Sequence, residues 1–149
     1  MSTHEFVETA IWSDPPFEAL TPHAKLVYFW SWTNPRCNLP GIYKATVRQI
    51  ILETGLRKVA VERVLAELEE AKLVFYDGTY VFVRARVKYL HSKSPNTAKG
   101  IRRELQKLNP EHAYVQGFLW LYARDGWIYL REILGDFSTP ASDPLRCAA

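Results

Sequence analysis

The chain has 149 residues, of which 48% are apolar and 13% aromatic, so it can bury a hydrophobic core and is not wholly disordered; its length favours one domain. Cys37 and Cys147 stand far apart and outside any Cys/His cluster, which predicts a reducing compartment and no zinc site. With no signal-peptide pattern at the start and no run of eighteen apolar residues, we expect a cytoplasmic protein without a membrane span.

Positive charge is concentrated in one part of the sequence. The net charge of the whole chain is +3, yet residues 84–107 contain eight Lys and Arg against one Glu, a net charge of +7. Residues 1–20 contain four acidic residues and no Lys or Arg. The basic block predicts a surface that meets a polyanion, although a solvated helix face would explain the same pattern.

The first part of the chain predicts an extension followed by one helix. Residues 6–12 alternate loosely between apolar and polar types, which favours a strand. Thr21-Pro22 has the form of a helix N-cap followed by proline at the first helical position, and Pro35 ends this helix. Because the helix has almost no polar face, we expect it to cross the centre of the domain or to offer one face to a second subunit.

A short strand at 41–43 and two helices are expected next. Thr46 and Gln49 have the spacing of a capping box, and Gly55 suits the left-handed residue that closes a helix. A further helix over about 57–72 has apolar residues at the spacing i, i+3, i+4, i+7, namely Val61, Val64, Leu65 and Leu68. Two helices joined by a turn with glycine predict a helix-turn-helix, although many helical proteins have similar corners.

The segment after these helices predicts a wing. Asp77-Gly78 between two apolar runs, 73–76 and 79–89, is a strong hairpin signal. Along the second run, strand alternation places Arg84, Arg86 and Lys88 on one face and valines on the other. A half-buried strand explains the valines but does not require three cations opposite them.

Helices are expected again in the last third of the chain. Ser94-Pro95 predicts the start of a helix whose outer side carries Lys99, Arg102, Arg103 and Lys107. Asn109-Pro110 predicts another start, and residues 127–134 a last short helix.

The fold class we predict is mainly α with a small β-hairpin, a winged helix-turn-helix followed by C-terminal helices. The expected parts are an N-terminal extension at 1–20, a winged-helix domain at 21–90, helices at 91–135 packed on it, and a disordered tail at 136–149.

Duplex DNA is the partner this pattern favours. The second helix of a helix-turn-helix enters the major groove with its N-terminal turns, and Glu67, Glu69 and Glu70 would repel phosphates farther along it. The candidate DNA-binding residues come from this helix, the wing and the basic block: Arg57, Lys58, Arg63, Arg84, Arg86, Lys88, Lys93, Lys99, Arg102 and Arg103.

No catalytic motif accompanies these candidates. The four histidines are scattered, and His23 and His112 are interpreted as surface or packed residues rather than metal ligands. Without a metal, phosphate-loop or nucleophile motif, we expect no enzyme activity, no metal site and no cofactor.

Several short segments follow one another in a familiar order. They are Ile11-Trp12-Ser13-Asp14, Leu20 to Leu26, Cys37 to Tyr43, Glu53-Thr54-Gly55-Leu56, Tyr76-Asp77-Gly78, Ser94-Pro95, Lys99-Gly100-Ile101 and Glu104-Leu105. From Ile11 to about Leu108 the chain thereby resembles the N-terminal winged-helix domain of phage replication initiators and DnaD-like primosomal proteins. The resemblance implies DNA binding during primosome assembly, replication proteins as partners, and self-association through the N-terminal strand and first helix. Little chain follows Leu108, which departs from the pattern of these proteins.

Two other functions fit the same fold. A winged helix also serves transcriptional regulators, and some winged helices bind protein instead of DNA, which the acidic second half of the third helix makes reasonable.

Overall fold

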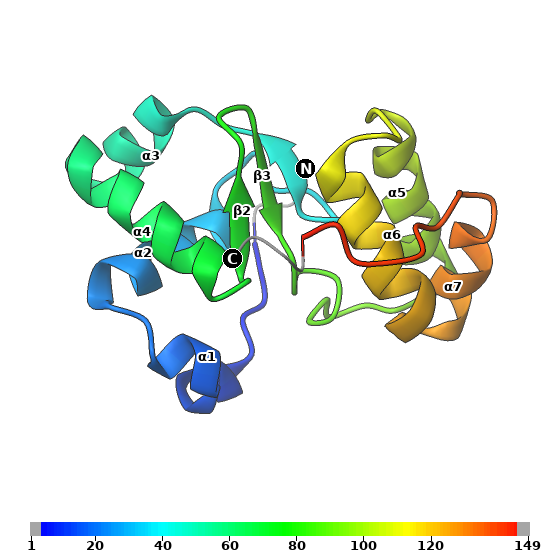
Figure 1. Cartoon of the computed structure of the whole chain (residues 1–149). Helices are drawn as coiled ribbons and strands as arrows, with labels where there is room; N and C mark the ends of the chain where they lie inside the picture. Colours follow the sequence, from blue (N-terminus) through cyan, green and yellow to red (C-terminus); the bar gives the residue numbers. More distant parts are fainter. Residues whose placement is uncertain (1–3, 146–149) are drawn as a thin grey trace. The chain divides into compact units, whose positions relative to one another are not determined.

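A computed structural model describes residues 4–145 (Figure 1). The chain divides into two compact units, one of Met1–Cys37 and Gly41–Tyr89 and the other of Asn38–Pro40 and Leu90–Ala149. The predicted fold class is confirmed, since the chain is mainly helical with one small antiparallel sheet. The length of the chain favours one domain, whereas the structure has these two compact units.

The N-terminal segment is not the predicted strand. It forms the 3-10 helix η1 (Thr9–Ser13) and the short helix α1 (Pro15–Glu18). The Glu8 carbonyl accepts a hydrogen bond from the Ile11 N–H at 3.1 Å, a local turn that strand pairing would not allow. The apolar residue Trp12 instead packs its ring against Phe17 and Phe29, with centroids 5.5 and 5.9 Å away.

Helix α2 (Pro22–Thr33) crosses the core of the first unit, which is the first of the two arrangements expected for it. The Thr21 hydroxyl accepts a hydrogen bond from the Ala24 N–H, as the predicted N-cap requires. Val27, Tyr28 and Trp30 are buried, whereas Leu26 remains 43% exposed. The helix therefore also leaves one apolar side chain at the surface.

The remaining elements of this unit are β1 (Ile42–Lys44), α3 (Val47–Thr54), α4 (Lys58–Glu70), β2 (Val74–Tyr76) and β3 (Tyr80–Val83). The sheet is antiparallel with strand order β1-β3-β2, and Phe82 of the central strand pairs with Ile42 and Phe75. Helix, strand, two helices and a hairpin in this order make a winged helix. The capping box of Thr46 and Gln49 and the left-handed Gly55, with φ of 77°, are confirmed.

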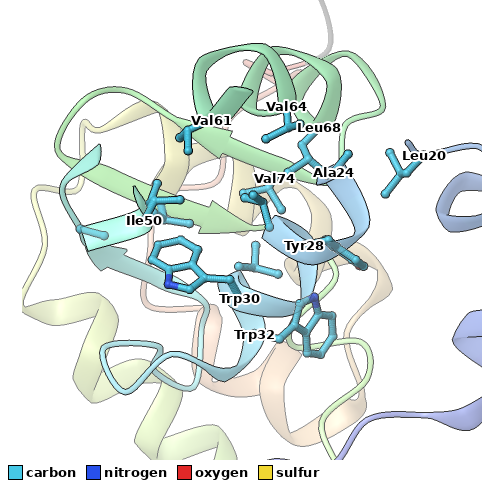
Figure 2. Close-up of a cluster of buried hydrophobic side chains, with 14 of the residues drawn as sticks. Leu20, Ala24, Tyr28, Trp30, Trp32, Ile50, Val61, Val64, Leu68 and Val74 are labelled. Carbon is cyan, nitrogen blue, oxygen red and sulfur yellow. The ribbon is translucent and has the colours of Figure 1, made fainter. Parts of the chain in front are cut away.

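The core of the winged helix lies where α2, α3 and α4 meet the sheet (Figure 2). Among the buried residues that form it are Leu20, from the segment before α2, and Ala24, Tyr28, Trp30, Trp32, Ile50, Val61, Val64, Leu68 and Val74 from these helices and the sheet. Because Val61, Val64 and Leu68 point into this core, the opposite side of α4 faces outward.

The second strand of the wing is shorter than predicted. It ends at Val83 instead of continuing to residue 89, and the chain then turns, with the Arg86 N–H donating to the Val83 carbonyl at 3.1 Å. Val81, Phe82 and Val83 are all buried, so both faces of the strand are covered. Strand alternation therefore does not extend over residues 84–88.

The second unit contains α5 (Pro95–Gln106), α6 (Ala113–Asp125) and α7 (Ile128–Leu134). The predicted start at Ser94 is confirmed, since its hydroxyl accepts the Thr97 N–H. Helix α6 begins three residues beyond Pro110, because the His112 ring accepts the Tyr114 N–H and caps it there. The buried apolar residues of these three helices are Ala98, Ile101, Leu105, Tyr114, Val115, Phe118, Leu119, Tyr122, Leu130 and Leu134.

The segment after α7 has no helix or strand in its described part. The structure describes this segment, expected to be a disordered tail, as far as Leu145, and there Asp143 and Leu145 are buried. The Asp143 carboxylate accepts the Leu145 N–H at 3.0 Å. Within residues 4–145, no helix combines the length and the apolar character needed to cross a membrane.

Candidate nucleic-acid interface

The first two turns of α4 carry exposed cations. Arg57 is the N-cap residue, and Lys58 and Arg63 follow on the outer side of the helix; all three are exposed. Val59 is 66% exposed between them. The turn that leads into this helix contains Gly55, whose left-handed backbone lets α3 end abruptly before α4.

A groove runs along the flank of α4 that faces the start of α2. Two adjoining hollows form it, of about 440 and 310 Å³, and both are lined by His23, Ala60 and Arg63. The first extends toward Leu56 and Arg57, the second toward Thr21 and Glu67. We call these two hollows the flank groove. The small side chain of Ala60 leaves the space between the helices open.

The sequence does not predict His23 as a site residue. It lies 40 positions before Arg63 in the sequence, and no spacing rule joins two residues so far apart. The two meet only because α2 packs across α4. A lone histidine after a helix-starting proline gives no signal of this in the sequence.

The acidic residues of α4 are partly engaged within the protein. The carboxylate of Glu67 accepts hydrogen bonds from the Thr21 N–H at 2.8 Å and from the Thr21 hydroxyl at 2.7 Å. Glu62 lies 3.8 Å from Lys58 in an exposed pair. The sequence predicts that Glu67 would repel phosphates if α4 lay deep in the DNA groove along its whole length; in the structure its carboxylate also caps the start of α2.

The predicted row of wing cations does not form. The buried guanidinium of Arg86 donates two hydrogen bonds of 2.9 Å to the Glu5 carboxylate and lies 5.7 Å from the centre of the Trp32 ring. Arg84 is half-buried and Lys88 is exposed. The prediction that these three cations share one face is wrong because β3 ends at Val83. Arg86 therefore contacts residues within its own unit, Glu5 and Trp32.

The tip of the wing is short and fixed against the start of α3. The Tyr76 hydroxyl lies 2.9 Å from the Ala45 carbonyl and 3.0 Å from that of Gly78, and it donates toward both. Burial, together with the nearby Asp77 carboxylate, raises the pKa of Tyr76 and keeps its hydroxyl protonated. Two exposed cations lie near this region, Lys44 at the end of β1 and Arg48 in the first turn of α3. Sequence reasoning missed both, since each stands alone outside the basic block.

The cations in and next to α5 belong to the second unit. Arg102 forms an ion pair with Asp136 at 2.8 Å, and Lys107 pairs with Glu104 at 3.1 Å. Lys93, Lys99 and Arg103 are exposed. Half of the predicted basic side of α5 is therefore paired within its own unit, while Lys99 and Arg103 face solvent.

Among residues 4–145, no three His, Cys, Asp or Glu side chains gather closely enough to hold a metal ion. The fold and surface define a winged-helix protein with a cationic face at the start of α4 and a groove beside it. No family model matches the chain, and neither a curated protein nor a solved structure matches it.

Proposed function

We propose that this protein binds duplex DNA through the first two turns of α4. In a helix-turn-helix the second helix enters the major groove with its N-terminal turns, and α4 holds that position in this fold. The observation that carries the proposal is the exposure of Arg57, Lys58 and Arg63 on the outer side of those turns. Lys44 and Arg48 add cations from the neighbouring strand and helix.

The exposed cations outside this helix are secondary contacts in the proposal. Lys88 and the half-buried Arg84 follow the wing, and Lys93, Lys99 and Arg103 lie in the second unit. Arg86 is excluded because Glu5 neutralises it, and Arg102 is weakened as a candidate by its pair with Asp136. Contacts from such residues would be to phosphates, which add affinity without reading sequence.

For the biological role, we propose DNA replication initiation or primosome assembly in the cytoplasm, with replication proteins as partners. The support is the resemblance of the segments from Ile11 to Leu108 to replication-initiator domains. A transcriptional regulator remains the alternative. Binding to a replication origin favours the first role, and binding to a palindromic site at a promoter favours the second.

A protein-binding role is the other alternative. Leu52 and Val59, at 71% and 66% exposure, are apolar residues on the two helices of the helix-turn-helix. Failure to shift any duplex at low salt would favour this role over DNA binding.

Self-association is part of the same proposal. The expected N-terminal strand is absent, so the surface that remains for it is formed by η1 and α2. Trp12 is 64% exposed and Leu26 43% exposed on these elements.

A binding titration at several salt concentrations tests the DNA proposal. It compares the wild type with the double variant Arg57→Ala/Arg63→Ala, and the matched control is Arg124→Ala/Arg131→Ala, which removes the same charge from α6 and α7. Roughly six to eight phosphate contacts imply a log-log salt slope of about −5 to −7 for the wild type. We expect the α4 variant to bind more weakly and the control to bind like the wild type. A wild-type slope near zero, or equal losses in both variants, would overturn the proposal.

A further inference from the structure

The flank groove has the lining of an anion site. Arg57 and Arg63 bring two guanidinium groups, and His23 brings an imidazole. The residues between them, Leu56 and Ala60, are apolar, so they offer an anion no competing acceptor. Glu67 is the acidic side chain in the lining, at the far end of the groove.

The carboxylate of Glu67 lies at the far end of the groove and is held there by Thr21. It accepts one hydrogen bond from the Thr21 N–H and a second from the Thr21 hydroxyl, at 2.8 and 2.7 Å. These donors bind its oxygens at the rim of the groove. The first hollow, which His23, Arg57 and Arg63 line, has no acidic side chain among the described residues of its lining.

We propose that one backbone phosphate of bound duplex DNA sits in the flank groove, held by His23 from α2 together with Arg63 from α4. This inference rests on the proposed DNA binding by α4. An imidazole N–H and a guanidinium both donate to phosphate oxygens, and arginine does so with two parallel bonds. His23 thereby becomes a DNA contact contributed from outside the helix-turn-helix.

The dimensions of the helix and the DNA groove favour a phosphate over a base. An α-helix with its side chains is about 10–12 Å across, and the major groove is about 12 Å wide, so a helix in that groove has a sugar-phosphate strand along each flank. His23 lies beside the flank of α4, and not on the side of that helix that faces away from the core. A residue in that position would meet the sugar-phosphate strand of DNA bound at α4.

We call this proposed phosphate-binding site, formed by His23 and Arg63, the phosphate seat. Two substitutions of His23 and one control test it. His23 is exposed and helix α2 is capped by Thr21, so both His23→Ala and His23→Lys are expected to fold. We expect His23→Ala to weaken duplex binding about tenfold, equally on unrelated sequences, because a phosphate contact carries no base information. We expect His23→Lys to restore the affinity and to steepen the salt slope by about 1 relative to His23→Ala. Arg131→Ala is the control, with binding unchanged.

Competing sources of phosphate are separated in the same experiment. Single-stranded DNA of the same length and inorganic phosphate at constant ionic strength are added as further probes. We expect His23→Ala to lose affinity for the duplex but not for the single strand, and inorganic phosphate not to compete.

The outcomes distinguish the two proposals. If the wild type binds duplex and both His23 variants bind it as tightly as the wild type does, the phosphate seat is wrong while DNA binding stands. An equal loss on single strand and duplex, or competition by inorganic phosphate, would also overturn the seat. If the wild type binds no duplex at low salt, the DNA proposal fails and the seat fails with it.

Discussion

The hydroxyl of Tyr43 donates a hydrogen bond of 2.7 Å to the backbone carbonyl of Ser31. Ser31 lies four residues before Pro35, which has no N–H, so this carbonyl lacks the partner that a continuing helix would supply. The same hydroxyl accepts a hydrogen bond of 2.8 Å from the Asn34 amide, which also donates to the Trp30 carbonyl. A side chain from β1 therefore completes the buried end of α2.

Removing this hydroxyl should destabilise the winged helix. Tyr43→Phe keeps the ring in place but leaves the Ser31 carbonyl and one Asn34 donor site without their partner in a buried region. We expect a loss of about 1–3 kcal/mol in the free energy of unfolding, the typical cost of unsatisfied buried groups. Urea denaturation measures it. Tyr129→Phe, at an exposed tyrosine of α7, is the control and should change stability little; an equally small effect at Tyr43 would contradict the role of the network.

Two glycines of nearly equal backbone conformation allow a second comparison. Gly41 has φ of 75° and Gly55 has φ of 77°, so alanine at either position has the same cost of a left-handed backbone. A Cβ at Gly41 would lie 2.7 Å from the Arg86 Cβ and 3.0 Å from the Val83 carbonyl, whereas a Cβ at Gly55 meets nothing within 4 Å. We expect Gly55→Ala to cost about 1 kcal/mol and Gly41→Ala about 1–3 kcal/mol more. Equal melting temperatures for the two variants would show that the contact at Gly41 relaxes.

Features that neighbouring residues determine could be predicted from the sequence. The cap at Thr21, the capping box at Thr46 and the left-handed Gly55 all depend on hydrogen bonds or backbone angles within a few positions. The Asp77-Gly78 turn is of the same kind, because the Asp77 carboxylate accepts the N–H groups of Thr79 and Tyr80 at 2.9 and 2.7 Å. From α2 to α7, these local features predicted the order of helices and strands correctly.

Features that depend on distant partners could not be predicted. The partner of Arg86 is Glu5, 81 residues earlier, and the length of β3 depends on where its neighbours β1 and β2 end. The flank groove has the same origin, since His23 meets α4 only through tertiary packing. A regular alternation of cations and valines therefore predicted an exposed strand face where the chain turns inward.

The pair of Glu5 and Arg86 should act as a coupled unit. The Arg86 side chain is 5% exposed and that of Glu5 28%, and two hydrogen bonds join them. In a double-mutant cycle of Glu5→Gln and Arg86→Met we expect a coupling of about 1–3 kcal/mol in the free energy of unfolding. We also expect Arg86→Met, at a salt concentration where it is folded, to leave the salt slope of DNA binding unchanged. Zero coupling would contradict the role of the pair in stability, and a slope reduced by about 1 would show that Arg86 contacts a phosphate.

The stability of the first unit should depend on pH through Glu53. Burial acts to raise the pKa of Glu53, but hydrogen bonds from the Trp30 indole and the Arg36 guanidinium outweigh it and lower the pKa below its usual 4.5. A lowered pKa in the folded state gives stability that is present above about pH 4.5 and is lost as the pH falls below that value. We expect Glu53→Gln to cost about 1 kcal/mol near pH 7 and less near pH 3. Chemical denaturation at both pH values measures this; a cost that grows toward acid pH would contradict it.

The exposed apolar residues of η1 and α2 allow the self-association proposal to be tested. The ring of Trp12 packs on Phe29, and Leu26 lies one helical turn before Phe29, so these side chains form one surface. If a second copy covers it, sedimentation velocity of the wild type should show a species heavier than 17.2 kDa whose fraction rises with concentration. We expect Trp12→Ser/Leu26→Ser to shift the population to the monomer. Leu52→Ser removes a more exposed apolar side chain, on α3, and should leave the association unchanged. A wild type that stays monomeric at every concentration would exclude this surface as a homotypic contact.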